Sequence, residues 1–177
     1  MPSFTPLDSS LATYSFIQLQ FQPAATATDV INIGGFSGTC KFRWISVSGS
    51  STVIPSAGTA QRASSIIRRT ARSTGGTSTN PLPAVVDSRD NPSGSVVSLW
   101  TVNPAGLGAG AVTMDAGTFT ITNAASIQDR AIFQYELQSS KPLVLNGAND
   151  FLCVNLTGGN PTLTTDRLDF DLWWTER

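Results

Sequence analysis

Hydrophobic and polar residues alternate along much of this chain, in short segments separated by turn residues. Alternation with a period of two is typical of a half-buried β-strand, because successive side chains of a strand point to opposite faces of the sheet. The clearest alternating segments are residues 17–22, 118–122, 131–137 and 168–174. Residues 151–156 are apolar without alternation, which predicts a central strand covered on both faces.

Within residues 40–47 the apolar residues fall on even positions as far as Trp44 and on odd positions from Ile45 onward. Such a change of phase inside one strand predicts a β-bulge, which inserts one extra residue and turns the side chains that follow to the other face. Trp44 and Trp174 each share their phase with apolar neighbours, so we expect both side chains in the hydrophobic core.

Residues 63–70 admit two interpretations. Ala63, Ile66, Ile67 and Thr70 recur at helical spacing, which is compatible with an amphipathic helix of two or three turns. The serines and β-branched residues of this segment, and the glycine pair that follows it, favour a strand instead, and a strand is our expectation.

The complete pattern predicts about eight to ten short strands joined by Gly, Pro and Asn turns, with no clear helix. We therefore expect an all-β fold, a jelly-roll-like antiparallel β-sandwich. Residues 1–12 contain two prolines and no periodicity, so we expect an extended N-terminal arm there. Residues 13–177 are expected to form a single β-sandwich domain, with a long loop at residues 73–94 and a flexible glycine-rich connector at residues 106–110.

Charged residues make up 13% of the chain and the formal net charge is −1, whereas about 25% charged residues is usual in soluble domains. A surface of this kind has no overall field to attract nucleic acid or an anionic membrane. The apolar runs are too short to span a bilayer, and the N-terminus does not have the pattern of a secretory signal. We expect no membrane association and no nucleic-acid partner.

The chain has no histidine. This absence removes the most common general base, the Ser-His-Asp and Cys-His pairs and most zinc sites. Asp169 and Asp171 share one strand face about 7 Å apart, a separation at which paired carboxylates can hydrolyse glycosides or, with Asp166, hold calcium; we prefer a solvated strand face. Cys40 and Cys153 are expected to be buried, reduced thiols, although a disulfide between two sheets stays open. No catalytic residue, cofactor or metal is therefore expected.

Basic residues concentrate in one short segment, residues 62–72, which contains four of the eleven lysines and arginines. These arginines can bind phosphates, contact acidic groups of a partner protein, or line a solvated strand face. Without interleaved aromatic residues a nucleic-acid site is disfavoured. Among the four tryptophans, which together can also form a sugar-stacking platform, Trp173 shares its phase with Asp169 and Asp171 and is the best candidate for an interfacial aromatic. The candidate contacts with a partner or another subunit are Arg62, Arg68, Arg69, Arg72, Arg89 and Trp173.

Five stretches carry a resemblance to a known group of proteins: residues 67–79, 87–92, 99–104, 151–156 and 174–176. Over roughly residues 60 to 177 the chain resembles small proteins encoded beside head genes in tailed bacteriophages, which are similar to head decoration, or cement, proteins of the small β-sandwich type. The resemblance implies a structural virion protein without enzymatic activity, made in the cytoplasm of the host bacterium. It implies a homotrimer on the capsid exterior that binds the major capsid protein and stabilises its lattice through the N-terminal arm, the 73–94 loop or both.

Two alternatives remain at this stage. The first is a carbohydrate-binding or receptor-binding β-sandwich module of a phage fibre or tail, which requires an exposed aromatic near Trp173. The second is an enzyme, which requires Asp169 and Asp171 to be catalytic.

Overall fold

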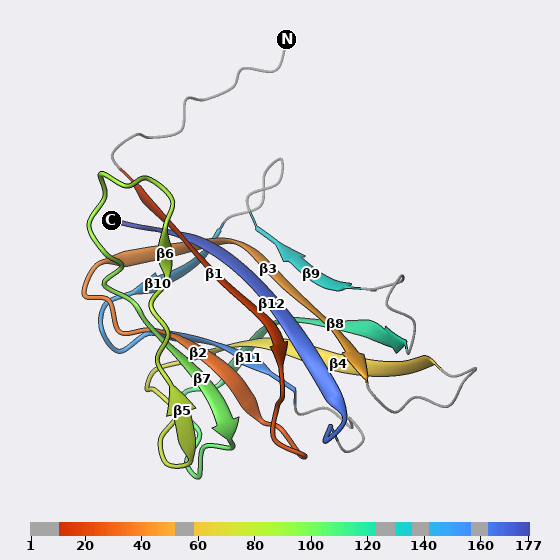
Figure 1. Ribbon diagram of the computed structural model, residues 1–177. Coiled ribbons are helices and arrows are strands. Elements are labelled where there is room, and N and C mark those ends of the chain that lie inside the picture. The colour runs from red at the N-terminus through yellow and green to blue at the C-terminus, as the bar shows by residue number, and fades with distance from the viewer. Residues whose placement is uncertain (1–10, 52–58, 123–129, 136–141, 157–162) are drawn as a thin grey trace.

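The computed structural model describes residues 11–51, 59–122, 130–135, 142–156 and 163–177 (Figure 1). In these residues every element is a β-strand, and the strands form two antiparallel sheets. Sheet one contains, in spatial order, β10 (Leu143–Asn146), β3 (Thr39–Ser51), β12 (Asp166–Glu176), β1 (Ala12–Phe21) and β6 (Ala84–Val85), with β9 (Arg130–Gln134) also paired to β3. Sheet two contains β5 (Thr77–Thr79), β7 (Val96–Val102), β2 (Asp29–Gly34), β11 (Phe151–Asn155), β4 (Thr59–Arg69) and β8 (Val112–Thr122).

The winding of the chain is that of a jelly roll. Without β5, β6 and β7, sheet one has β1, β12 and β3 followed by β9 and β10, and sheet two has the order β2, β11, β4, β8. From β1 to β4, each strand lies in the opposite sheet from the strand before it. With β5, β6 and β7 left aside, the chain then stays in sheet two from β4 to β8. It returns to sheet one for β9 and β10, crosses to sheet two for β11 and ends in sheet one with β12. The predicted jelly-roll-like antiparallel sandwich is confirmed.

The hydrophobic core lies between the two sheets and takes side chains from both. In β12 the even positions from Leu168 to Trp174 are almost fully buried and the odd positions between them are only partly buried, as the alternating sequence predicts. Trp174 is 0% exposed and stacks on Phe42 with ring centroids 5.7 Å apart. The core expectation for Trp174 is therefore confirmed.

The predicted bulge is present in β3. Trp173 pairs with Trp44 while Trp174 pairs with Phe42, so Arg43 is the extra residue on β3. The bulge allows Phe42 and Ile45 to face the core together, each 0% exposed. Because it turns Trp44 to the outer face, where this side chain is half-buried, the core expectation for Trp44 is wrong.

Residues 59–69 form strand β4 and pair with β8 from Thr59 to Arg68, so the strand interpretation is confirmed and the helical one is wrong. The expected 73–94 loop is more ordered than predicted, because it contains the short strands β5 and β6. Of the expected N-terminal arm, only Leu11 and Ala12 lie in the described residues, and Ala12 is the first residue of β1.

Residues 70–111, between β4 and β8, form what we call the insertion. It carries β5 and β7, which extend sheet two beyond β2, and β6, which pairs with β1 at the edge of sheet one. The insertion therefore lies along the side of the sandwich formed by β1 and β2 (Figure 1). It links the two sheets outside the nine strands of the jelly-roll arrangement.

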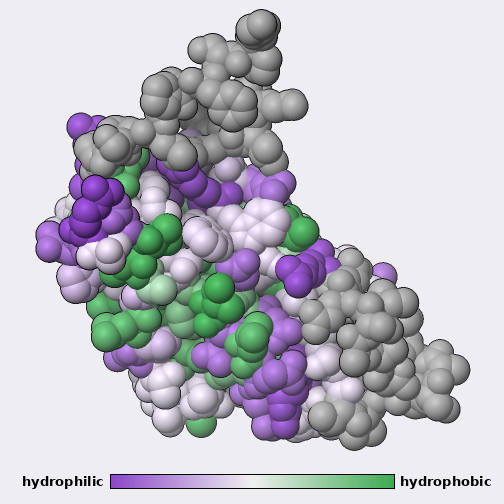
Figure 2. All heavy atoms as spheres, turned by 45° about the horizontal axis from the view of Figure 1, so that its top comes forward, coloured by the Kyte–Doolittle hydropathy of each residue, from purple (hydrophilic) through white to green (hydrophobic). Residues whose placement is uncertain are grey.

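The outer face of sheet one is not uniformly polar. Ile17 and Leu19 on β1 and Ile132 on β9 are 56%, 63% and 48% exposed. Figure 2, turned so that the top of Figure 1 comes forward, shows hydrophobic side chains gathered in the middle of the visible surface with hydrophilic ones around them. Scattered apolar residues are normal on a protein surface, whereas a gathered group indicates a contact or binding surface.

Candidate functional site

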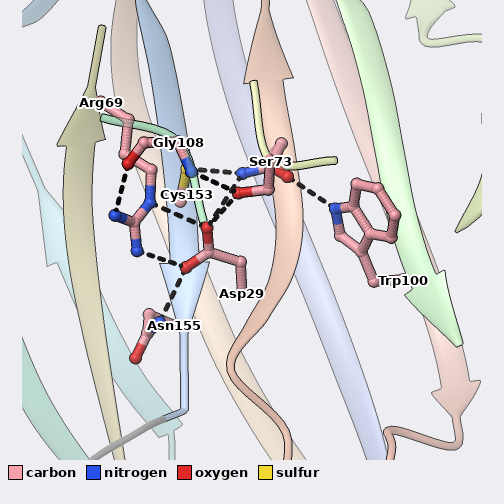
Figure 3. A network of polar contacts seen from close by, with 8 residues as sticks. Asp29, Arg69, Ser73, Trp100, Gly108, Cys153 and Asn155 are labelled. Atoms are coloured by element: carbon pink, nitrogen blue, oxygen red, sulfur yellow. Dashed lines mark hydrogen bonds and ion pairs between the residues drawn. The ribbon is translucent and has the colours of Figure 1, made fainter. Parts of the chain in front are cut away.

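The base of the insertion is held by a buried carboxylate, that of Asp29 at the start of β2 (Figure 3). Asp29 is 1% exposed. The guanidinium of Arg69 donates to both of its oxygens, from Nε to Oδ2 at 2.8 Å and from Nη2 to Oδ1 at 2.9 Å. Ser73 Oγ donates to Oδ2 at 2.7 Å and Asn155 Nδ2 to Oδ1 at 2.7 Å. The carboxylate thus joins β2, β4 and β11 to the first residues of the insertion.

The same network reaches the other end of the insertion through Gly108. Arg69 Nη1 donates to the carbonyl oxygen of Gly108 at 3.0 Å, and the amide of Gly108 donates to Ser73 Oγ at 3.3 Å. Main-chain hydrogen bonds also join Thr70 to Ala109, at 2.9 Å, and residues 74 and 106 to one another. Both ends of the insertion are therefore fixed to one buried ion pair.

Gly108 is required at its position because the chain passes very close to it. A Cβ atom there would overlap the carbonyl oxygen of Ala71 and lie 3.1 Å from Cδ of Arg69. The connector at residues 106–110 was expected to be flexible, but its main chain is hydrogen-bonded to the start of the insertion. Glycine serves here for close packing rather than for mobility.

The electrostatics of Asp29 are those of a stabilising ion pair. Burial alone would raise the pKa of Asp29, but the hydrogen bonds from Arg69, Ser73 and Asn155, together with the positive charge of Arg69, hold that pKa below its ordinary value of 3.8. Ser73 is 1% exposed, so its hydroxyl is not accessible to a substrate. The group stabilises the fold and has no features of a catalytic pair.

The network continues to β7 through Asn32. Trp100 Nε1 donates to Asn32 Oδ1 at 2.6 Å, and Asn32 Nδ2 contacts the sulfur of Cys153. Cys40 and Cys153 are both free and buried. Burial raises the pKa of the Cys40 thiol to about 11 and raises that of Cys153 as well. The expected reduced thiols are confirmed, and neither thiol is ionised at neutral pH.

A second anchor holds the insertion to sheet one through Glu176 of β12. Its Oε1 accepts from Ser93 Oγ at 2.6 Å, and its Oε2 accepts from the amide of Gly94 at 2.8 Å. Burial alone would raise the pKa of Glu176, but the hydrogen bonds from Ser93, Ser95, Trp174 and the Gly94 amide keep it below its ordinary value of 4.5. The carboxylate therefore fixes the turn that leads into β7.

Between these anchors the insertion exposes a large apolar side chain. Leu82, between Pro81 and Pro83, is 91% exposed, and Val86 is 52% exposed. The Val86 amide donates to the carbonyl oxygen of Thr13 at 3.0 Å, so the segment is hydrogen-bonded to β1 just beyond Leu82. The apolar residues are thus presented by a segment that is already ordered.

The arginines predicted to contact a partner differ in their surroundings. Arg62 is 6% exposed and forms an ion pair with Asp166, which links β4 of sheet two to β12 of sheet one. Arg69 is buried with Asp29. The other three pairings lie nearer the surface: Arg68 with Asp150, Arg72 with Asn80, and Arg89 with Asp87. The geometry gives Arg62 and Arg69 a role inside the fold, and a partner role for these arginines stays a prediction.

Trp173 lies on the outer face of sheet one and is half-buried, and its Nε1 donates to Asp171 Oδ1 at 2.7 Å. Asp169 Oδ1 accepts from the main-chain amide of Gln20 at 2.7 Å. Asp166 faces inward to Arg62, so it does not join the other two aspartates. No group of three potential ligands in the described residues could hold a metal ion.

The residues that sequence reasoning missed are Asp29, Ser73, Asn155 and Glu176. Their only signal in the sequence is a polar residue beside or within an apolar strand pattern, as in residues 29–33. Nothing in that signal identifies the partner. The buried pair could be found only by placing β2 and β4 on either side of β11.

Comparisons of the chain with protein-family models, with curated proteins and with solved structures give no match. The described residues contain no candidate transmembrane helix.

Proposed function

We propose that this chain is a structural virion protein, a decoration or cement protein that binds the outer surface of a phage head and stabilises the lattice of the major capsid protein. The observation that carries the proposal is the exposure of Leu82 on an insertion that is anchored to both sheets. An apolar side chain on a segment that is already ordered loses little conformational entropy when a partner covers it. Such a side chain is suited to contact another protein.

The surface beside Leu82 has the shape that such a contact needs. A hollow of about 290 Å³ lies between residues 80–83 and 93–97 of the insertion. A side chain of the partner can enter this hollow while Leu82 enters the partner, as happens where pairs of hot-spot residues meet at an interface. The occupant we propose is the major capsid protein.

The charges of the chain agree with a protein partner. Arg62 and Arg69, two of the four arginines of the basic segment, are neutralised inside the fold by Asp166 and Asp29. The cluster therefore offers no group of free guanidinium ions to phosphates. Together with the resemblance to decoration proteins, this supports a non-enzymatic homotrimer on the capsid exterior, made in the host cytoplasm.

The test uses phage heads assembled without this chain and the purified full-length protein. We expect the wild-type protein to co-sediment with the heads and to raise their resistance to heat. Leu82→Asp should weaken binding by at least about tenfold, because truncation of a hot spot costs about 2 kcal/mol or more. The matched control is Val112→Asp on β8, which is 55% exposed and remote from β6 in the strand order.

The proposal fails if the wild-type protein leaves the heads unbound and unstabilised. It also fails in its choice of surface if Val112→Asp weakens binding as much as Leu82→Asp does. Light scattering after gel filtration tests the trimer, which requires three times the mass of one chain.

A further inference from the structure

The outer face of sheet one contains a hollow of about 150 Å³ that the proposed capsid contact does not use. It lies over β1, β3 and β12 and shares no lining residue with the hollow beside Leu82. Its lining includes Ile17, Leu19, Ser46, Ser48, Asp169 and Asp171. Ser46 pairs with Asp171 and Ser48 with Asp169 across the strands β3 and β12, so these four side chains form two adjacent rows. The hollow exists because the two serines are small and their neighbours are larger.

Ser46 and Ser48 are each only 3% exposed and line the hollow. Neither hydroxyl is hydrogen-bonded to another residue in the described part of the chain, and neither oxygen is among the fully enclosed unpaired atoms there, so both open on the hollow. An unpaired hydroxyl has a donor and acceptors to offer. Two such groups at the bottom of one hollow therefore point to a polar ligand.

The rim adds further polar groups. Asp171 accepts one hydrogen bond, from Trp173, on its Oδ1, and a carboxylate can accept about four. Asp169 and Arg130 also line the hollow. Carboxylate oxygens next to hydroxyl groups are suited to bind the adjacent hydroxyls of a polyhydroxylated ring.

The hollow also has apolar sides. Ile17 and Leu19 line it and are more than half exposed, which favours contact with C–H groups of a ligand. Trp173 follows Asp171 on the same face, and Trp44 lies directly opposite Trp173 on β3. The hydrogen bond from Trp173 to Asp171 limits the freedom of the indole, so an aromatic surface stands next to the hollow in a fixed position.

The volume limits the ligand to a small group. Drug-sized ligands occupy pockets of roughly 300–1,000 Å³, whereas a cavity of about 150 Å³ in another protein holds a single benzene ring. We infer that the hollow binds one ring of a saccharide, with its hydroxyls on Ser46, Ser48, Asp169 and Asp171 and its C–H groups against Ile17 and Leu19. The lining of the hollow carries two carboxylates and one guanidinium, so neutral sugars and amino sugars fit better than uronic or sialic acids.

The experiment applies the full-length protein to an array of immobilised neutral, amino and acidic saccharides, and titrates hits with the free methyl glycosides by calorimetry. For a single ring we expect a dissociation constant in the millimolar range and stronger binding to the multivalent array. Ser46→Val fills the hollow and removes a hydroxyl, and Asp171→Ala removes acceptors from the rim. Each should weaken binding at least about tenfold.

Two matched variants control for the chemistry of these changes. Ser98→Val alters a buried, unpaired serine of sheet two, and Asp115→Ala removes an exposed carboxylate from β8. Both should bind the saccharide as the wild type does, and urea unfolding verifies that all four variants are folded.

Absence of binding by the folded wild-type protein overturns the inference, as does binding that survives both Ser46→Val and Asp171→Ala. If the array stays silent while a lysine- or arginine-rich peptide binds and Asp171→Ala abolishes that binding, the hollow is a protein contact instead. None of these outcomes depends on Leu82 or on phage heads, so this inference and the proposed function can fail separately.

Discussion

The guanidinium of Arg69 donates two parallel hydrogen bonds to the buried carboxylate of Asp29, at 2.8 and 2.9 Å. Arg69 is the last residue of β4 and Asp29 the first of β2, and β11 lies between these two strands. Because Ser73 and Gly108 bond to the same pair, one ionic contact determines where both ends of the insertion lie. Leu82 lies on the segment between these two ends, so its position depends on the buried ion pair of Asp29 and Arg69.

Replacing Arg69 should destabilise the whole protein. Arg69→Met leaves the Asp29 carboxylate buried without its counter-ion, which typically costs about 3 to 5 kcal/mol. Urea unfolding should show the loss as a lower midpoint, and hydrogen exchange should become faster at residues 70–76 and 105–110. The control is Arg89→Met, since Arg89 pairs with Asp87 at an exposed site. Equal midpoints for the two variants would contradict the anchoring role of Arg69.

Arg62 and Arg68, the other two arginines of β4, should also differ in how much their replacement lowers the free energy of unfolding. Arg62→Met removes one partner of a pair whose side chains are 7% and 0% exposed, so we expect a loss of about 3 to 5 kcal/mol in the free energy of unfolding. The Arg68 side chain is 43% exposed, and its partner Asp150 also accepts from the Asn146 amide. Arg68→Met should therefore cost about 1 kcal/mol or less. Urea midpoints measured side by side decide this, and the reverse order would refute it.

These differences show what the sequence can and cannot predict. Alternation in residues 168–174 and the change of phase beside Arg43 are local patterns, and both were sufficient to predict a strand and its bulge. The two-residue and three-residue strands β6 and β5 are too short to show a period, so residues 73–94 were predicted as a loop.

The buried anchor could not be predicted, because its partners lie far apart in the chain. Asp29 and Arg69 are separated by 40 positions, and Asp29 and Asn155 by 126. Arginines grouped in sequence suggested a common charged surface. The pairing of β4 with β11 and β8 instead places Arg62 and Arg69 with different buried acids.

Acid should weaken the fold through Asp29 and Glu176. The folded-state pKa of each carboxyl lies below its ordinary value, 3.8 for Asp29 and 4.5 for Glu176, and the unfolded chain has the ordinary values. Their contribution is therefore complete above those values and is lost as the pH falls below about 4.5 and then through the folded pKa values. Urea midpoints should be nearly constant from neutral pH to about pH 5 and fall steeply below it.

Glu176→Gln isolates one part of this dependence, because it removes the titrating carboxyl while it keeps a carbonyl oxygen that accepts from Ser93. Its midpoint should fall less between about pH 5 and about pH 3 than that of the wild type. Asp115→Asn, at an exposed position of β8, serves as the control and should follow the wild-type curve. A Glu176→Gln curve parallel to the wild type would remove Glu176 from the explanation.

The glycines of the 106–110 connector provide a test of whether it is fixed or flexible. A Cβ on Gly108 would overlap the Ala71 carbonyl oxygen, whereas a Cβ on Gly106 would meet only the Thr74 side chain, at 3.3 Å, and its carbonyl oxygen, at 3.9 Å. Gly108→Ala should therefore cost about 1 to 3 kcal/mol, as overpacking of a close contact does, while Gly106→Ala should stay within about 0.5 kcal/mol of the wild type. In a flexible connector both substitutions would be equally mild, since either alanine could move away from its neighbours. Urea unfolding of the two variants distinguishes these cases, and faster hydrogen exchange at residues 70–76 in Gly108→Ala alone would locate the damage at the base of the insertion.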